Sequence, residues 1–428
     1  MVSSSRFDII EHKCANGLSV LMLQAETAPV CCVSVWYRAG SRHDATGKSG
    51  TAHFLEHMMF KGTAQYSKGA YDSVLHTIGA SNNASTWLDR TNYYILIGSD
   101  RYETALELEA DRMRGLLLRP EDVRDERTVI LNELDRNSDD PGSALIDRVL
   151  ATVFEKHPYR CPVIGWRPEV EGITRADLVS YYDSYYQPDN AFLVIVGQFV
   201  TEEMIETVER YFGSIPKSTQ ASTTKEPPAS IVEPPQTAER RFAMNRAGQQ
   251  DLLGIAFHAP QRANQDTYAM DILAQVLGHG RTSRLYRGLV ESGLAVHASA
   301  ENQSMPADPF LFLLDIELAA GADVERVEST VDQVISSLIS QPVSKNELKR
   351  ALKRARVDFV MRRDSVSALA FLLGEFEIST GWQFIETYLD NLNKVTPDQI
   401  SAVTERYLTR QSRTIGHLQP SANRKEQV

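Results

Sequence analysis

The sequence has few cysteines, no excess of basic charge and no long apolar run. Its four cysteines, Cys14, Cys31, Cys32 and Cys161, include no Cys-x-x-Cys pair. Cys31 and Cys32 are adjacent and would point to opposite faces of a strand, which is poor geometry for a disulfide. We therefore expect buried free thiols in a reducing compartment.

The chain contains no uninterrupted apolar stretch of about 20 residues, so a transmembrane helix is not expected. The N-terminal segment has no basic stretch followed by a long apolar run, so no secretory signal is visible. These two features predict a cytoplasmic protein without a membrane partner, or a periplasmic protein if a signal peptide has been removed.

The net charge of −11 argues against a nucleic-acid partner, because such binding needs a basic surface. A hydrophobic fraction of 42% and a charged fraction of 24% are typical of globular proteins. A chain of 428 residues has room for about two or three domains.

A polar, proline-rich segment divides the chain into nearly equal halves. Residues 217–241 read KSTQASTTKEPPASIVEPPQTAERR, a composition typical of an extended linker. We therefore predict an N-terminal domain over residues 1–216, a linker over 217–241 and a C-terminal domain over 242–428.

The two halves contain similar helix-then-strand patterns. One begins at Thr174 (TRADLVSYYDSYYQPDNAFLVIVG), and the other begins 222 residues later at Thr396 (TPDQISAVTERYLTRQSRTIGHL). Each opens with a threonine that can cap a helix. Amphipathic helix–strand units often look alike by chance, so the pattern favours a duplicated domain without proving it.

Predicted helices and strands come in clusters and do not alternate strictly. In the first half, Val30–Tyr37 is rich in strand-forming residues, and residues 83–97 are strand-like. Helices are expected over residues 49–60 and 120–137. This arrangement predicts an α+β fold of two similar domains, each a mainly antiparallel sheet covered by helices.

Two histidines and a glutamate stand together in the segment His53-Phe54-Leu55-Glu56-His57. Because His53 and His57 are four residues apart, a helix would present both imidazoles on one face, within reach of one cation. Glu56 would lie beside that cation. The surrounding residues are apolar nearly all round the helix, so it should be buried, and buried ionisable groups need a partner such as a metal ion.

A third ligand for such a metal has to come from elsewhere in the chain. A catalytic zinc ion usually has three protein ligands and one open position for water. Glu126 and Glu133 are seven residues apart in a predicted helix, nearly in line along one face. The composition of this segment alone favours the interpretation that both are solvated surface carboxylates, so whether either binds a metal stays open at this point.

Several stretches together resemble one known family. They are NGLSV at Asn16, AGSRHD at Ala39, GTAHFLEHMMFKGT at Gly50, NASTWLDRTNYY at Asn83, ERTVILNEL at Glu126 and YQPDNAFLVIVG at Tyr186. With them the chain resembles the pitrilysin/insulinase family of zinc peptidases, in the branch of short two-domain subunits that includes mitochondrial processing peptidase. The resemblance covers essentially the whole chain and is weaker in the second half.

This resemblance implies a zinc site and its catalytic groups. It implies that one zinc ion per chain is held by His53, His57 and Glu133. It also implies that Glu56 is the catalytic base, which activates the attacking water, and that Glu126 assists catalysis.

The resemblance further implies that Asn83 and Ala84 begin an edge strand that binds substrate. An extended peptide can add to an open sheet edge through main-chain hydrogen bonds, so sequence specificity would be loose. An ordinary exposed hairpin strand is the alternative reading of this segment.

The second half departs from the metal-binding pattern. In the aligned stretch AMDILAQVLGHG, Asp271 and Gln275 stand where the histidines would be, so we expect no zinc there. Active members of the resembled family often use an Arg and a Tyr from the second half, yet residues 309–318 contain neither. We read Arg284 and Tyr286 as structural helix residues. A heterodimer with a homologous subunit that supplies the pair is therefore favoured over a homodimer.

The motifs and the resemblance together predict a zinc-dependent endopeptidase that cleaves peptides or unstructured polypeptides. The resemblance implies that cleavage takes place inside a chamber closed by another pair of such domains. One alternative is a non-catalytic structural subunit of a larger complex, but such relatives typically have a degraded metal motif and this motif is intact. Another is a metal-dependent hydrolase of non-peptide amides, which the expected edge strand disfavours.

Overall fold

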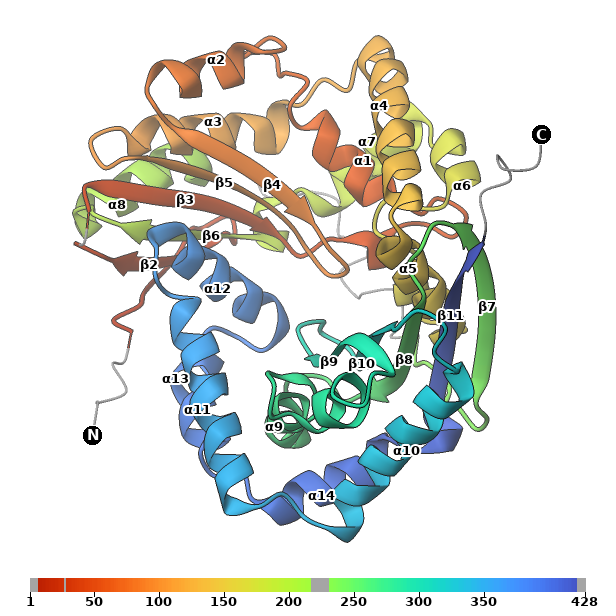
Figure 1. The fold of residues 1–428 in the computed structure, drawn as a ribbon. Coiled ribbons are helices and arrows are strands. Elements are labelled where there is room, and N and C mark those ends of the chain that lie inside the picture. Colours follow the sequence, from red (N-terminus) through yellow and green to blue (C-terminus); the bar gives the residue numbers. More distant parts are fainter. Residues whose placement is uncertain (1–6, 27, 217–230, 422–428) are drawn as a thin grey trace. The chain divides into compact units, whose positions relative to one another are not determined.

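The computed structural model describes residues 7–26, 28–216 and 231–421 (Figure 1). The chain divides into two compact units, each built from several segments. The first unit draws on Met1–Asp135, Cys161–Ile231 and Arg362–Ile378, and the second on Arg136–Arg160, Val232–Met361 and Ser379–Val428. Residues 217–230 of the expected linker lie outside the described residues.

The first unit contains a six-stranded sheet. Its spatial order is β1 (Ile10–Lys13), β2 (Ser19–Gln24), β6 (Ala191–Gly197), β3 (Val30–Tyr37), β5 (Thr91–Gly98) and β4 (Ser81–Thr86). Strands β2 and β6 are parallel, and every other neighbouring pair is antiparallel. The sheet is therefore mainly antiparallel, as the sequence predicts.

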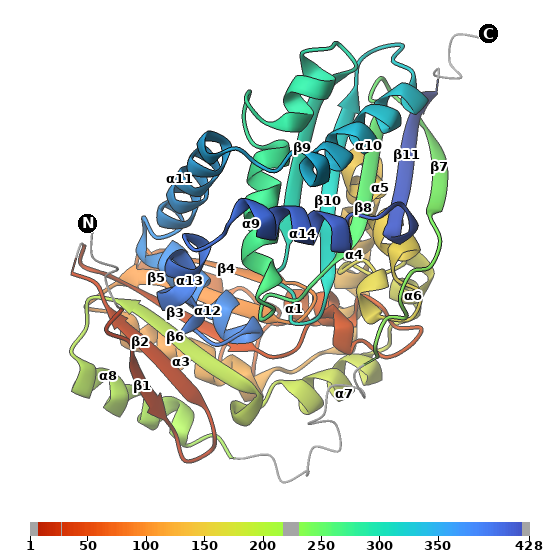
Figure 2. The same ribbon diagram turned by 90° about the horizontal axis from the view of Figure 1, so that it is seen from below.

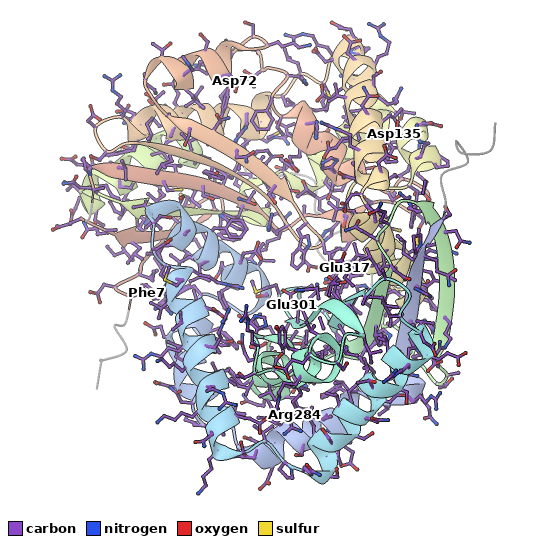
Figure 3. All side chains as sticks on the ribbon, viewed as in Figure 1. Phe7, Asp72, Asp135, Arg284, Glu301 and Glu317 are labelled. Atoms are coloured by element: carbon purple, nitrogen blue, oxygen red, sulfur yellow. The ribbon has the colours of Figure 1, made fainter. Side chains whose placement is uncertain are left out.

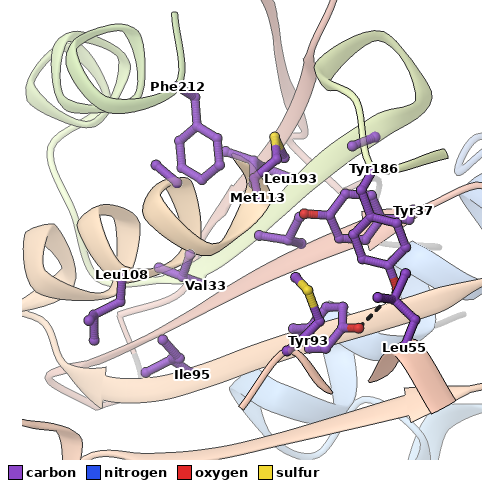
Figure 4. Packing of buried hydrophobic residues seen from close by; sticks show 14 of the residues in the cluster. Val33, Tyr37, Leu55, Tyr93, Ile95, Leu108, Met113, Tyr186, Leu193 and Phe212 are labelled. Atoms are coloured by element: carbon purple, nitrogen blue, oxygen red, sulfur yellow. Dashed lines mark hydrogen bonds between the residues drawn. The ribbon is translucent and has the colours of Figure 1, made fainter. Parts of the chain in front are cut away.

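Helices bury the centre of this sheet. The helices of the first unit are α1 (Thr51–Met58), α2 (Ala70–Thr77), α3 (Tyr102–Gly115), α4 (Pro120–Asp139), α6 (Arg167–Gly172), α7 (Arg175–Tyr185), α8 (Thr201–Val208) and α12 (Val366–Ser379). Figure 4 shows the core on one face, where Val33, Leu108 and Phe212 pack together and the hydroxyls of Tyr93 and Tyr186 lie 2.9 Å apart.

The opposite face of the sheet is covered by α12. The ring of Trp36 lies 5.5 Å from that of Phe371, measured between centroids, and a side chain on Gly374 would collide with the Trp36 indole. Because both faces are covered, Cys31 and Cys32 are both buried although they point to opposite sides, and neither forms a disulfide.

The second unit contains a five-stranded sheet with the same plan. Its order is β7 (Arg240–Ala247), β11 (Arg413–Ser421), β8 (Leu252–Ala259), β10 (Phe310–Leu318) and β9 (Ala295–Gln303). The β7–β11 pair is parallel, like β2–β6 of the first sheet, and the other pairs are antiparallel. Its helices are α5 (Pro141–Val153), α9 (Asp266–Gly278), α10 (Val324–Ser340), α11 (Lys345–Met361), α13 (Phe384–Leu392) and α14 (Pro397–Tyr407).

The two halves of the chain repeat one order of elements (Figures 1 and 2). The series β2, β3, α1, β4, β5, α3, α4, α5, α7, β6 is matched by β7, β8, α9, β9, β10, α10, α11, α12, α14, β11. Thr174 and Thr396 both begin the matched helices α7 and α14 with a capping box. The predicted α+β fold of two similar domains is confirmed.

One helix of each half belongs to the other half's unit. Helix α5 precedes the linker but lies in the second unit, where Leu145 and Val149 are the neighbours of Gly254 on β8. Its counterpart α12 follows the linker but lies in the first unit. The units therefore differ from the predicted ranges 1–216 and 242–428 by this reciprocal exchange.

Two local expectations need correction. Residues 83–97 are not one strand but the end of β4, a turn and most of β5, because Trp87 N–H donates to Arg90 C=O across a tight turn. The helix expected over residues 49–60 is limited to Thr51–Met58. No helix within the described residues is both long and apolar enough to cross a membrane.

Candidate active site

The start of α1 is fixed by a carboxylate and a glycine. Asp44 accepts hydrogen bonds from the backbone N–H of Gly50 at 2.8 Å and of Ala52 at 2.9 Å. Gly50 has φ +92°, and a Cβ there would lie 2.5 Å from the carbonyl oxygen of Ile164. Another residue at position 50 would therefore shift the helix that carries both histidines.

The structure brings His53, His57 and Glu133 together. The two imidazole rings lie 4.7 Å apart between centroids. His53 Nε2 is 3.8 Å from Glu133 Oε1, and His57 Nε2 is 3.4 Å from Glu133 Oε2. One donor atom from each of the three side chains lies within 4.8 Å of the other two. Two imidazole nitrogens and a carboxylate oxygen at this spacing fit a hydrolytic zinc ion.

Glu126 orients one of these imidazoles. His57 Nδ1 lies 2.9 Å from Glu126 Oε1, and the other oxygen of Glu126 is paired with Lys61. When Nδ1 donates its proton to this carboxylate, Nε2 carries the lone pair and faces Glu133. That is the tautomer a metal ligand needs, and a carboxylate on the remote nitrogen also raises the basicity of the ligating one.

The charges of the group follow from burial and from these contacts. Burial, with the neighbouring His57, lowers the pKa of His53 to about 3, so this imidazole is neutral, as a metal ligand must be. Burial alone would lower the pKa of His57 as well, but Glu126 and Glu133 raise it above its usual value. Burial would raise the pKa of Glu126, but the hydrogen bonds from His57 and Lys61 lower it.

Glu56 stands beside this group and is not part of it. Its Oε2 accepts a hydrogen bond of 2.5 Å from the hydroxyl of Thr86 on β4. Burial raises the pKa of Glu56 above that of a free carboxyl, although the Thr86 bond opposes the shift. A carboxylate with a raised pKa is suited to general-base work near neutral pH.

The expected substrate strand lies at an edge of the sheet. β4, which contains Asn83 and Ala84, is the last strand in the sheet order, and among the described strands it pairs only with β5. Thr86 of the same strand contacts Glu56, so this edge runs up to the candidate general base. The backbone along the free side of β4 can accept an extended peptide.

Three contributors to this region were missed by sequence reasoning. Lys61 lies four residues after His57, beyond the end of α1, and Thr86 lies three residues after Asn83, so spacing from the motifs was a usable signal for both. Arg90 lies in the matched stretch NASTWLDRTNYY, which by itself assigned it no role. Its guanidinium binds the Ser85 carbonyl at 2.9 Å and Glu375 of α12 at 2.6 Å, which ties the turn of the hairpin to α12.

Two sequence models of one peptidase family match the chain. The model described as insulinase (peptidase family M16) matches residues 19–166, and the model described as peptidase M16 inactive domain matches residues 172–355. The chain belongs to peptidase family M16. The pitrilysin/insulinase resemblance read from the motifs is thereby confirmed.

Curated relatives of this M16 chain are named as zinc proteases. The zinc protease PqqE of Helicobacter pylori is 28% identical over 405 residues, which span 94% of this chain and 90% of the relative. An uncharacterized zinc protease of Mycobacterium leprae is 27% identical over 399 residues, spanning 92% and 88%. The similarity thus extends over nearly the full length of both chains.

Solved structures agree with this assignment. The crystal structure of a protease from Helicobacter pylori superimposes with a TM-score of 0.91 at 26% identity, covering 97% of this M16 chain and 100% of that one. The periplasmic protease PqqL of Escherichia coli shares the fold, with a TM-score of 0.80 at 15% identity. This chain covers 48% of PqqL.

In the second half of this M16 chain, hydrogen bonds occupy the positions aligned with the histidines. Gln275 Nε2 donates to Asp358 Oδ2 at 3.2 Å, and Asp271 accepts from the Tyr388 hydroxyl and from Asn302 Nδ2, each at 2.7 Å. Two buried amide oxygens of this group, Gln275 Oε1 and Asn302 Oδ1, have no hydrogen-bond partner among the described residues. That the second half binds no zinc stays a prediction.

Arg284 is engaged inside the second unit (Figure 3). Its guanidinium donates to Glu347 at 3.2 Å and to the Ser337 hydroxyl at 3.1 Å. Tyr286 begins a short π-helical segment, η5 (Tyr286–Val290). These contacts support the structural reading of this stretch.

Proposed function

We propose that this chain is a zinc-dependent endopeptidase whose metal is held by His53, His57 and Glu133. The observation that carries the proposal is the convergence of their three donor atoms within 4.8 Å. The separate carboxylate of Glu56 lies on α1, the helix that carries both histidines. When bound, zinc would polarise the scissile carbonyl and acidify water at the site.

The chain's own residues would divide the remaining work. Because Thr86 holds Oε2 of Glu56, Oε1 is the oxygen available to take a proton from the attacking water and return it to the leaving amine. Glu126 would keep His57 in its ligating tautomer. Asn83 and Ala84 would bind the substrate main chain along the edge of β4.

Replacement of the candidate base tests this assignment. Glu56→Gln is expected to keep stoichiometric zinc and to lower kcat for an unstructured peptide by about 100- to 10,000-fold. The exposed Glu202→Gln on α8 is the control and should leave both quantities unchanged. Undiminished turnover by the Glu56 variant would refute the role of this residue.

Metal analysis separates the peptidase from the structural-subunit alternative. Zinc content should fall by about one ion per chain from the wild type to a His53→Ala variant, whereas a scaffold without metal at this group should lose none. Comparing peptides with small non-peptide amides as substrates addresses the other alternative, because only a peptide can use the edge of β4.

A homologous subunit is part of the proposal. β10 carries neither an Arg nor a Tyr to bind the substrate carbonyl, and Arg284 is held by Glu347. We therefore expect weak peptide hydrolysis by the isolated chain and a large gain on adding a homologous subunit that supplies such a pair. Full activity of the isolated chain would contradict an obligate heterodimer.

A further inference from the structure

A second group of metal-ligating side chains lies in the first unit, away from the candidate active site. His12 is on β1, Cys14 follows the same strand, and Glu209 begins the π-helical turn η4 (Glu209–Gly213) after α8. One donor atom from each lies within 4.8 Å of the other two. β1 and β4 are opposite edges of the six-stranded sheet, so this group is remote from Glu56 (Figure 2).

Glu209 is the centre of the group. Its Oε1 is 2.7 Å from His12 Nε2, and its carboxylate also interacts with the Cys14 thiol. The side chain of Cys14 is buried, whereas those of His12 and Glu209 are partly exposed. An imidazole, a thiol and a carboxylate therefore converge from two segments nearly 200 residues apart, with one open side toward solvent.

The surrounding backbone holds these two segments in register. Buried Asn16 donates to the carbonyl oxygens of Phe212 at 2.7 Å and Ile215 at 3.1 Å, and accepts from Leu18 N–H. A Cβ on Gly213 would lie 2.3 Å from the carboxylate of Glu209, so a larger residue there would displace the end of that side chain. The bonds of Asn16 thus hold together the two segments that carry the donor atoms, which helps to position a metal site.

We propose that His12, Cys14 and Glu209 form a second metal site, suited to zinc or another borderline divalent cation. Thiolate, imidazole and carboxylate are the ligand types that zinc accepts, and water can fill the fourth position on the open side. The site would fasten the edge strand β1 to η4 and act in stability instead of catalysis.

The charge of Glu209 favours a cation at this position. Its carboxylate lies beside both the His12 imidazole and the Cys14 thiol and would attract a dication. Cys14 would bind as the thiolate, so binding would release the thiol proton to water.

Cobalt substitution tests this site separately from the proposed peptidase site. The group of His53, His57 and Glu133 has no sulfur, so a sulfur-to-cobalt charge-transfer band in the near ultraviolet reports the Cys14 site alone. Titrating reduced, zinc-free protein with Co²⁺ should produce this band, saturating at about one ion per chain for this site.

Matched variants decide the outcome. Cys14→Ser should abolish the band, and Glu209→Gln should weaken cobalt binding by more than about 10-fold. Cys161→Ser and Glu133→Gln should both retain the band, the latter even if the peptidase proposal is wrong. Circular dichroism verifies that each variant is folded. Absence of the band in the wild type, or its persistence in Cys14→Ser, would overturn the proposal.

Discussion

The imidazole of His57 has its two nitrogens committed to different partners. Nδ1 faces Glu126 and Nε2 faces Glu133, so a single side chain links the candidate ligand group to a supporting carboxylate. Lys61 occupies the second oxygen of Glu126 and fixes that carboxylate in turn. The affinity of the proposed zinc site would therefore depend on groups that do not bind the metal themselves.

Removing the charge of Glu126 should therefore weaken metal binding without removing a ligand. In Glu126→Gln the neutral amide accepts the Nδ1 proton of His57 less strongly, so the tautomer with Nε2 free to bind metal is less stabilised. We therefore expect zinc affinity to fall by about 10- to 100-fold. Competition with a fluorescent chelator measures this constant. Asp125→Asn, at an exposed position on the same helix, should retain wild-type zinc affinity. A Glu126→Gln variant with wild-type affinity would show that the contact with His57 does not strengthen metal binding.

The hydroxyl of Thr86 should matter to turnover and not to metal affinity. A hydrogen bond to a charged group is worth about 1.5–3 kcal/mol, and this one fixes the orientation of Glu56. We expect Thr86→Val to lower kcat by about 10- to 100-fold at unchanged zinc content. Ser85, the residue before Thr86, is the control, because its hydroxyl accepts a hydrogen bond from Arg90 and not from the site. In Ser85→Ala, kcat should change far less. Equal losses in both variants would indicate general damage to β4.

Spacing in the sequence predicted only part of this site. His53 and His57 share a helix face because of their spacing, and Glu133 was selected by resemblance. The partners of Glu56 and Glu126 were not predicted, because Thr86 and Lys61 reach them through strand and helix packing. Whether the named residues hold zinc and catalyse hydrolysis stays a prediction for the experiments above.

Helix α12 is held on the first sheet by close contact and by a buried ion pair. Gly374 lets the helix approach the Trp36 indole, and Glu375 binds the guanidinium of Arg90, with both side chains nearly excluded from solvent. The same guanidinium lies over the Trp36 ring, 5.3 Å from its centroid. Because Arg90 also binds the backbone of β4, this pair connects the helix to the strand beside Glu56.

Breaking this pair should destabilise the first unit. Glu375→Gln leaves the Arg90 charge buried without its counterion, and we expect a loss of about 3 kcal/mol in the free energy of unfolding. Glu377→Gln on the same helix breaks a more exposed pair with Arg38 and should cost less than about 1 kcal/mol. Urea unfolding of the zinc-free proteins gives both values. A Glu375 variant as stable as the Glu377 variant would contradict this account.

The whole molecule is one fold used twice, with different side chains at equivalent places. The order of the five matched strands, the parallel pair among them and the order of the matched helices all recur, so the weak match between Thr174 and Thr396 did indicate a repeat. The exchange of α5 and α12 between the units was not predictable from the chain. Both helices bury apolar side chains, but the spacing of these residues does not predict against which of the two similar sheets each helix packs.

The two repeats should respond differently to zinc. Metal bound by His53, His57 and Glu133 stabilises the folded state of α1 and α4, by about 2.7 kcal/mol at a free zinc concentration 100 times the dissociation constant. Amide exchange there should slow by up to about 100-fold, whereas exchange in the counterparts α9 and α11 should not change, because Asp271 and Gln275 stand in place of the histidines. Hydrogen–deuterium exchange mass spectrometry resolves these helices separately. In Glu133→Gln the slowing in α1 and α4 should disappear, and zinc-dependent protection of α9 and α11 would instead place a metal in the second repeat.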